Sequence, residues 1–174
     1  RTDFPLSAGG LWRQRGGPSS RTGRHRHKPA TQCSLMWLYQ RRVLFRYDRT
    51  FYFQKASDVA PPIYEIVRSA NETAISKIRP GVPLCELDGA ARDLIAEQGY
   101  GPFFTHRLGH FIGLGEHEFG DVSSVNTQKA EPGMIFSIEP GIYLPGDTGV
   151  RVEDLVLVTE DGCEVLNHYP RNLR

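Results

Sequence analysis

With 174 residues, of which 39% are apolar and 24% charged, the chain can bury a core of its own and has the composition of a soluble globular domain. Its longest apolar runs are far shorter than a membrane span, and its N-terminus lacks the apolar stretch of a signal peptide, so we expect no membrane association. Residues 1–50 carry eleven Lys and Arg against two Asp (net +9), whereas residues 51–174 carry ten Lys and Arg against eighteen Asp and Glu (net −8).

The N-terminal part of the chain shows little sign of regular structure. Residues 8–32 are rich in Gly, Arg, Ser and Pro without periodicity, which predicts loop or disorder, and arginines interrupt the strand-forming residues of 34–53. The excess of arginine has two interpretations. The segment is a basic arm that contacts nucleic acid, or it is not the product of the same evolutionary selection as the rest of the chain. Three scattered cysteines without a Cys-x-x-Cys pair (Cys33, Cys85 and Cys163) favour a reducing, cytoplasmic setting.

Two amphipathic helices are predicted after a short β-rich stretch at residues 50–53. The first opens at Pro61 and Pro62, has apolar residues at helical spacing, and stops at Pro80 and Gly81. The second runs from about residue 85 to 98 and ends at Gly99. Both are expected to cover a sheet.

The second half of the chain predicts strands separated by turns. Residues 134–139 read as a strand, and residues 149–158 as a strand that is apolar on both faces and therefore central. A hairpin turn at residues 160–162 leads into a last strand at 163–166.

Three of the six histidines fall within residues 106–117, among aromatic residues, leucines and glycines. Apolar surroundings disfavour a charged imidazole and suit a neutral nitrogen ligand or a proton relay. The alternative is a buried core histidine with hydrogen-bonded companions, because a histidine pair alone is a weak metal signal.

Two glutamates, Glu139 and Glu153, lie within apolar strands, where an ionised carboxylate is costly unless it is paired or bound to metal. Taken singly, Glu139 could accept hydrogen bonds in a turn, and Glu153 could pair with Arg151. Together with one histidine they form a ligand set suited to Mn²⁺, Co²⁺ or Zn²⁺, which can activate water for amide hydrolysis.

Three ordered stretches, residues 105–114, 137–143 and 149–156, resemble the pita-bread metallopeptidases, the superfamily of creatinase, aminopeptidase P, prolidase and methionine aminopeptidase. They are similar in particular to the Xaa-Pro dipeptidase (prolidase) and aminopeptidase P group. Methionine aminopeptidases usually carry a histidine after the last glutamate, where this chain has Asp154. The resemblance covers residues 49–174 and implies an α+β pita-bread fold that is incomplete on its N-terminal side.

The resemblance implies a site with two divalent metal ions, for which His110, Glu139 and Glu153 supply ligands. Glu139 is similar to the carboxylate assigned as general base. The reaction implied is hydrolysis of the peptide bond before proline by metal-activated water, with a proline-containing peptide as substrate. A homodimer is a further possibility, and no nucleic acid or membrane partner is implied.

Three further residues match positions with family roles. His106 and His117 correspond to the catalytic histidines that bind substrate and stabilise the intermediate, and Arg151 to an arginine that orders the site.

The family pattern has two more ligands, aspartates eleven residues apart, which this chain lacks. Asp48 stands directly before Arg49, displaced by two residues from the second of these positions. With three of five ligands present, we predict weak metal binding and little or no activity. The alternative is a non-catalytic pita-bread module that binds peptides or proteins, although such modules typically lose all the ligands.

A shifted reading frame over residues 11–48 would explain both the missing aspartates and the arginine excess. Codons that are allowed for residues 43–48 can be read one base later as Tyr-Cys-Ser-Asp-Met-Thr, which joins the family pattern at Arg49. Residues 29–36 can be written so that a two-base shift gives Gly-Asp-Ala-Val-Leu-Val-Asp-Val. We therefore divide the chain into residues 1–48, disordered or mis-framed, and residues 49–174, the C-terminal part of the catalytic domain.

Overall fold

The computed structural model describes residues 31–33, 37–40, 43–46, 48–53, 57–115 and 117–173. The disorder predicted for residues 8–32 falls outside these ranges except for Thr31 and Gln32, which lie in the short strand β1 (Thr31–Cys33). No helix in these parts of the chain is long and apolar enough to cross a membrane.

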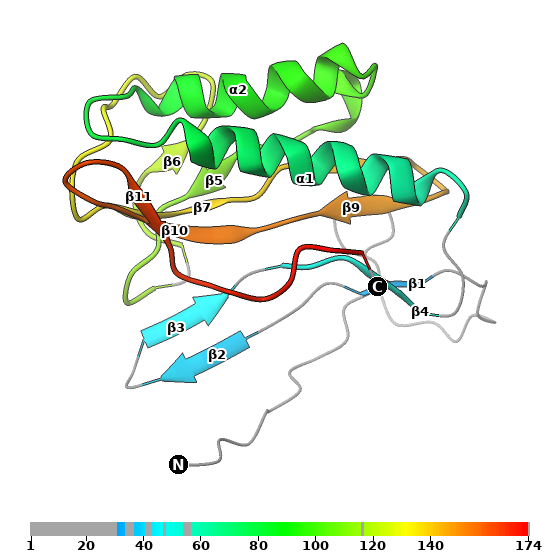
Figure 1. The fold of residues 1–174 in the computed structure, drawn as a ribbon, viewed down its shortest axis with the longest axis horizontal. Helices are drawn as coiled ribbons and strands as arrows, with labels where there is room; N and C mark the ends of the chain where they lie inside the picture. Colours follow the sequence, from blue (N-terminus) through cyan, green and yellow to red (C-terminus); the bar gives the residue numbers. More distant parts are fainter. Residues whose placement is uncertain are drawn as a thin grey trace.

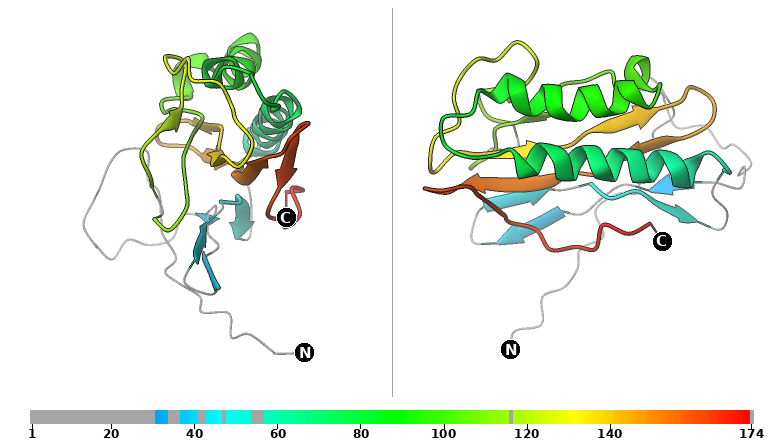
Figure 2. Two further views of the ribbon diagram at one scale, coloured as in Figure 1. Left: turned by 90° about the vertical axis from the view of Figure 1, so that its left-hand side faces the viewer. Right: turned by 45° about the horizontal axis from the view of Figure 1, so that its top comes forward.

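Two helices lie side by side and cover one face of the strands (Figures 1 and 2). They are α1 (Ala60–Ser76) and α2 (Leu84–Glu97), in agreement with the sequence prediction. Pro61 and Pro62 occupy the first turn of α1, where the missing backbone N–H groups cost nothing. Gly99 ends α2 with a φ of 84°, a left-handed conformation that glycine adopts without steric cost.

The central sheet has three antiparallel strands in the order β11-β10-β7. They are β7 (Ile135–Ile138), β10 (Asp154–Val158) and β11 (Cys163–Val165), and the middle strand β10 is buried, as its apolar sequence predicts. The predicted hairpin turn is present, with the Thr159 N–H donating to the carbonyl of Gly162 at 3.0 Å. The predominance of helices and antiparallel strands confirms the α+β class.

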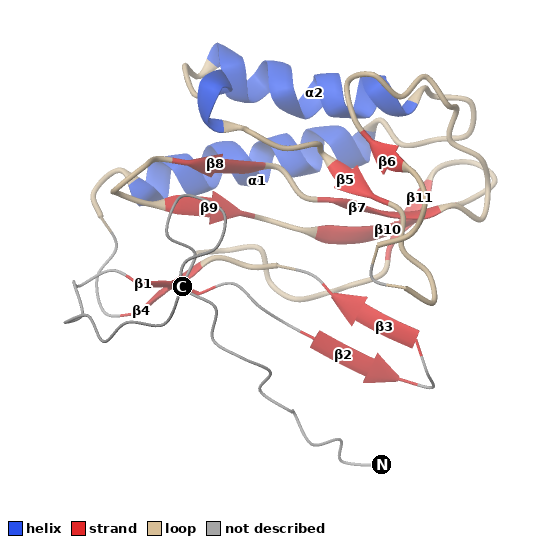
Figure 3. Ribbon diagram, turned by 180° about the vertical axis from the view of Figure 1, so that it is seen from behind, coloured by secondary structure: helices blue, strands red, loops and turns tan. Residues whose placement is uncertain are grey.

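Two further strand pairs form two-stranded sheets of their own. One consists of β5 (Gly109–His110) and β6 (Asp121–Val122), and the other of β8 (Gly141–Tyr143) and β9 (Gly149–Arg151). A bridge between Phe111 and Phe136 connects β5 to β7. Figure 3, in which the molecule is seen from behind, shows β8 in front of α1.

The single long strand predicted for residues 149–158 is wrong. The chain forms β9 and β10, which pair with different partners, and Val152 and Glu153 stand between them. Likewise Glu139 follows β7 instead of lying within it. Both glutamates therefore occupy strand ends, where the backbone leaves the sheet ladder and can aim a side chain away from the regular alternation.

The remaining strands precede the helices. They are β2 (Trp37–Gln40), β3 (Val43–Arg46) and β4 (Phe51–Phe53); β2 pairs with β3, and β4 with β1. Arg49 forms a bridge with Val152, which joins this part of the chain to the bend between β9 and β10. Figure 1 shows the β2–β3 hairpin on the side of the central sheet opposite the helices.

Candidate metal centre

His110 is held on β5 by an unusually close approach of that strand to β7. A Cβ atom on Gly109 would lie 1.8 Å from the carbonyl oxygen of Ser137, so only glycine permits this packing. The backbone N–H of His110 donates to Ser137 Oγ at 2.9 Å. Its Nδ1–H donates to the carbonyl of Phe111 at 3.0 Å, which leaves Nε2 as the nitrogen with a lone pair.

Glu139 and Glu153 bring their carboxylates to the same point. Glu139 Oε1 lies 3.6 Å from His110 Nε2 and accepts a hydrogen bond from Ser137 Oγ at 3.3 Å. Backbone bonds fix both residues, since the N–H of Glu139 donates to Leu108 at 2.8 Å and that of Glu153 to Asp48 at 2.9 Å. The two residues are 8% and 1% exposed.

The three side chains form a cluster that suits a divalent cation. One ligand atom from each of His110, Glu139 and Glu153 lies within 4.8 Å of the others, and all three residues are buried. Two carboxylates that converge in a buried place repel each other, and a bound cation removes that penalty. One imidazole nitrogen and two carboxylates are a donor set for Mn²⁺, Co²⁺ or Zn²⁺. The residues present therefore fit a metal ion.

Asn71, a residue of α1 that the sequence pattern does not single out, ties the two glutamate-bearing bends to the helix. Its Nδ2 donates to the carbonyl of Ile138 at 2.9 Å and to that of Val152 at 3.4 Å. These two residues directly precede Glu139 and Glu153. The only sequence signal for Asn71 is a polar residue at a core position of an amphipathic helix. Such a residue commonly stabilises the fold and does not by itself indicate a functional site.

A chain of hydrogen bonds runs from the cluster to His106. Arg151 Nε donates to the hydroxyl oxygen of Tyr143 at 2.7 Å, and that hydroxyl is 2.9 Å from His106 Nε2. His106 Nδ1–H donates to the carbonyl of Arg107 at 2.7 Å, so the Tyr143 hydroxyl is the donor to Nε2. Burial, and then the charge of Arg151, lower the pKa of His106 to about 4, which keeps the imidazole neutral at pH 7.

Burial raises the pKa of Tyr143 to about 12, against the effect of Arg151. Burial disfavours the charge of Arg151 itself, but Tyr143, Glu139 and Asp48 raise its pKa above the usual value. The phenol thus stays protonated and the guanidinium stays charged at pH 7.

Arg151 pairs with Asp48 and Glu139. Its Nη1 is 3.2 Å from Asp48 Oδ2 and 3.5 Å from Glu139 Oε2. The alternative pairing of Arg151 with Glu153 rests on strand alternation, and the bend at Glu153 breaks that alternation. Asp48 does not belong to the metal-type cluster found among the described residues; its carboxylate instead faces the guanidinium.

His117 lies at the outer side of the cluster. It is exposed, and its ring centroid is 4.0 Å from that of His110, with 32° between the ring planes. The loop that carries it is closed by Glu118, whose Oε1 accepts the N–H of Gly115 at 3.0 Å. The structure thus brings His117 against the candidate ligand, whereas His106 contacts the site through Tyr143.

Asp154, next to Glu153, faces the opposite way into a cluster of cationic and amide donors. Its Oδ1 accepts from Arg49 and, at 2.6 Å, from Asn167 Nδ2, and its Oδ2 lies 2.9 Å from Arg171 Nε. Arg49 also donates to the carbonyl of Glu153. We call Asp154, Arg49, Asn167 and Arg171 the Asp154 cluster.

A second anchoring pair holds the segment in front of β5. Asp88, buried on α2, accepts the N–H of Leu108 at 3.0 Å and two bonds from Arg92. Arg92 in turn donates to the carbonyls of Phe104 and His106. An Asp and an Arg four residues apart on a helix were visible in the sequence, but such a pair is usually a surface contact.

Comparison with known proteins identifies the family to which the chain belongs. The model of metallopeptidase family M24 matches residues 36–160, and this chain belongs to that family. It is 54% identical over 123 residues to an uncharacterized peptidase of Staphylococcus aureus, which covers 71% of this chain and 35% of the relative.

Among solved structures, an Xaa-Pro dipeptidase from Bacillus anthracis is 37% identical with a TM-score of 0.78, covering 83% of this chain and 40% of the other. An X-Pro aminopeptidase from Thermotoga maritima is 35% identical with a TM-score of 0.75 and the same coverage. The predicted pita-bread fold is therefore confirmed. The chain spans only 35% of the curated relative and 40% of these solved chains.

Proposed function

We propose that this chain carries a metal-dependent peptidase site of the Xaa-Pro dipeptidase and aminopeptidase type, which hydrolyses the peptide bond before proline. The observation that carries the proposal is the buried convergence of His110, Glu139 and Glu153 in a chain of family M24. The similarity to an Xaa-Pro dipeptidase and an X-Pro aminopeptidase supports the choice of substrate.

In this proposal His110, Glu139 and Glu153 would hold a Mn²⁺, Co²⁺ or Zn²⁺ ion, which would supply the activation of water for hydrolysis. Glu139 is the general base, since its carboxylate lies inside the cluster and can take a proton from that water. His117 contacts the substrate from the exposed side. Both ring nitrogens of His106 have partners here, so a direct contact of His106 with substrate requires its bond to Tyr143 to break.

The proposed activity is low. The family's two aspartate ligands have no counterpart in the sequence, and Asp48 directs its carboxylate toward Arg151. A second ion of a dinuclear site would need those aspartates as ligands. Their absence also weakens the binding of the first ion. We therefore expect weak metal binding and slow or undetectable turnover.

Titration with Mn²⁺, Co²⁺ and Zn²⁺, followed by an assay on an Xaa-Pro dipeptide and on a longer Xaa-Pro peptide, tests the function. The expected result is saturable metal binding that Glu139→Gln and His110→Ala weaken, with slow cleavage that depends on metal and on Glu139. Turnover unaffected by Glu139→Gln would overturn the role of that residue. Peptide binding that needs no metal, with no metal bound by the chain, would establish the non-catalytic binding module instead.

The cellular setting and assembly are part of the same proposal. We propose a cytoplasmic location, on the basis of the scattered cysteines, and a homodimer, on the basis of the family resemblance. Fractionation of the source cells tests the first, and sedimentation of the purified chain tests the second; a monomer at all concentrations would exclude the dimer.

We also propose that residues 11–48 were read in a shifted frame and that residues 49–174 are the C-terminal part of the catalytic domain. The absent aspartates and the concentration of arginine before residue 50 support this proposal. The coding DNA tests it directly. A single continuous frame without codons that could give the two aspartates would reject the shift.

A further inference from the structure

The peptide unit that joins Arg107 to Leu108 is held from both of its sides. Its N–H, on Leu108, donates to Asp88 Oδ1 at 3.0 Å. Its carbonyl, on Arg107, accepts the Nδ1–H of His106 at 2.7 Å. The N–H and the carbonyl of a planar trans peptide point in opposite directions, so the bond to Asp88 also sets the direction in which the carbonyl meets the imidazole.

Asp88 can set this direction because its own carboxylate is fixed. The residue lies on α2 and is completely buried. Arg92, one turn further along the helix, donates from Nε to Oδ2 at 2.7 Å and from Nη2 to Oδ1 at 2.9 Å. A two-pronged contact between a guanidinium and a carboxylate fixes the plane of both groups. Asp88 therefore presents Oδ1 to the Leu108 N–H in one orientation.

Arg92 holds His106 by two further routes. Its Nη1 donates to the carbonyl of Phe104 at 3.1 Å and its Nη2 to the carbonyl of His106 at 2.9 Å. Its guanidinium carbon also lies 4.2 Å from the centre of the Phe104 ring. That ring stands edge-on to the His106 imidazole, with 5.1 Å between centroids and 87° between planes. The pair on α2 thus fixes both the backbone around His106 and one side of its ring.

The bond from Nδ1 decides what the other ring nitrogen can do. A neutral imidazole carries one proton, and the hydrogen bond at one nitrogen determines where that proton resides. With the proton on Nδ1, the Nε2 of His106 has a lone pair, and the Tyr143 hydroxyl lies 2.9 Å from it. The direction of one backbone carbonyl therefore decides whether Nε2 accepts or donates a hydrogen bond.

We propose that Asp88 and Arg92 are positioning residues of the candidate active site, which set the tautomer of His106 through the peptide unit of Arg107 and Leu108. The inference rests on the proposed function only for the contact of His106 with substrate. It distinguishes this pair from an ordinary anchor of the fold, which would hold the segment without determining the protonated nitrogen of the imidazole.

The first test is the nitrogen-15 NMR spectrum of the imidazoles in the full 174-residue chain at pH 7, without metal. A ring nitrogen that carries a proton resonates far from one that carries a lone pair, and the spectrum of His106→Gln identifies the signals of His106. The expected result is a protonated Nδ1 and an unprotonated Nε2. A proton on Nε2, or an equal mixture of the two tautomers, would overturn the inference.

The second test changes the pair. Asp88→Asn keeps the size of the side chain but leaves one oxygen to serve both Leu108 and Arg92, and Arg92→Lys keeps the charge but loses the planar fork. In both variants the two nitrogen signals of His106 are expected to move toward each other as the tautomers mix. The matched control is Arg68→Lys on α1, because Arg68 makes a similar bond to Glu65 on the exposed side of its helix. It should leave the His106 signals unchanged.

An unchanged Nδ1–H tautomer in folded Asp88→Asn and Arg92→Lys would overturn the inference and leave the pair as an anchor of the fold alone. Circular dichroism shows whether each variant folds. If neither folds, the wild-type chain decides through the scalar coupling across the hydrogen bond between the Leu108 amide and the Asp88 carboxylate carbon. Absence of that coupling would overturn the inference. A chain that binds no metal would overturn the proposed function and leave the tautomer result as it stands.

Discussion

Glu153 and Asp154 are neighbours in sequence, are both almost completely buried, and solve the problem of a buried carboxylate in different ways. Glu153 enters a cluster with Glu139 and His110, in which the neighbouring ligand atoms belong to a second carboxylate and an imidazole. Asp154 enters the Asp154 cluster, in which arginine and asparagine side chains of the protein supply the donors.

Under the proposed function, the difference separates a carboxylate that binds an external cation from one that stabilises the fold. Burial alone does not distinguish the two residues, because an ionised carboxylate is costly to bury at either position. The two residues differ in the contacts described above: Asp154 faces hydrogen-bond donors, whereas Glu153 faces the ligand atoms of Glu139 and His110. The comparison also explains why Arg49 bonds to both residues: it neutralises Asp154 and at the same time fixes the backbone carbonyl of Glu153.

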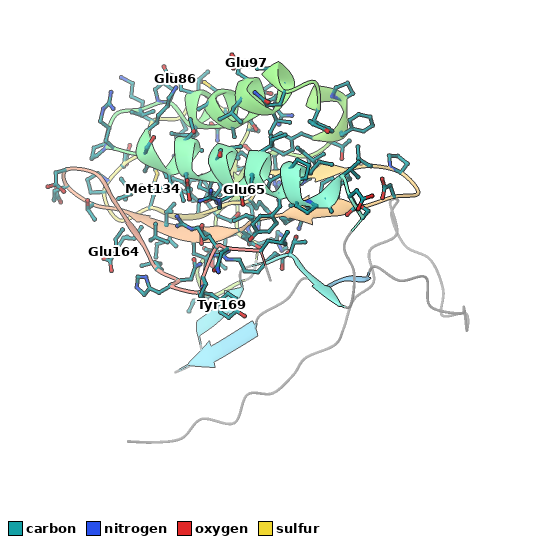
Figure 4. The ribbon with its side chains drawn as sticks, turned by 45° about the vertical axis from the view of Figure 1, so that its right-hand side comes forward. Glu65, Glu86, Glu97, Met134, Glu164 and Tyr169 are labelled. Atoms are coloured by element: carbon teal, nitrogen blue, oxygen red, sulfur yellow. The ribbon has the colours of Figure 1, made fainter. Side chains whose placement is uncertain are left out.

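The largest effect is expected from Asp154→Ala. It removes the ion pair from Arg49, whose side chain is 6% exposed, and from Arg171, so the free energy of unfolding should fall by about 3–5 kcal/mol, the cost of breaking a buried pair. Urea denaturation measures this loss. The control is Glu164→Ala on β11, where the side chain is exposed beside the strand (Figure 4) and a change within about 0.5 kcal/mol is expected. Equal losses in the two variants would show that Asp154 is not a structural centre.

Glu153→Gln should give the opposite pattern. Without metal, the neutral amide relieves the repulsion from Glu139, so the unfolding free energy should stay the same or rise. The affinity for Mn²⁺ should fall about 100-fold, equivalent to about 2.7 kcal/mol. Calorimetry measures the affinity, and the exposed Glu131→Gln serves as the matched control. Destabilisation of the metal-free protein comparable to that of Asp154→Ala would erase the distinction between the two carboxylates.

The sequence predicts the cluster of Glu153 better than that of Asp154. The two buried glutamates and the need for a histidine follow from chemistry, the choice of His110 follows from the family resemblance, and the helices follow from periodicity and from Pro61, Pro62 and Gly99. The bend at Val152 and Glu153 could not be predicted, because it arises from pairing with different strands, a tertiary property.

The partners of Asp154 lie far apart in the chain. Arg49 precedes it by more than a hundred residues, and Asn167 and Arg171 come from the C-terminal segment. The periodicity of a helix or strand relates only residues close together in sequence, so it cannot predict contacts between such distant positions. The pairing of Asp48 with Arg151, at 103 residues of separation, escapes prediction for the same reason.

A substitution of Asn71 tests whether the positions of both glutamates depend on its hydrogen bonds. Asn71→Ala removes buried donors to the carbonyls of Ile138 and Val152, and should lower the unfolding free energy by about 2 kcal/mol. Because those residues precede both glutamates, the affinity for Mn²⁺ should fall as well. Ser69→Ala on the same helix is the control. Lower stability with unchanged metal affinity would show that Asn71 supports the fold alone.

The smallest effect concerns His106, which stands at the end of the chain of hydrogen bonds from Arg151. Its pKa of about 4 in the folded chain lies below the ordinary imidazole value of 6.5, so between these values the unfolded chain binds more protons and stability rises with pH. The contribution of this residue between pH 5.5 and pH 7 is about 1 kcal/mol.

His106→Gln cannot titrate, so its unfolding free energy should rise less between pH 5.5 and pH 7 than that of the wild-type chain. Urea denaturation at the two pH values measures the difference. Asp88, Arg92 and Arg151 also act on His106, but their charges are present in both proteins, so the comparison isolates the imidazole. Parallel pH profiles would mean that His106 has the same pKa in the folded and the unfolded chain, so that at pH 5.5 it would be protonated in the folded state and could not accept from the Tyr143 hydroxyl.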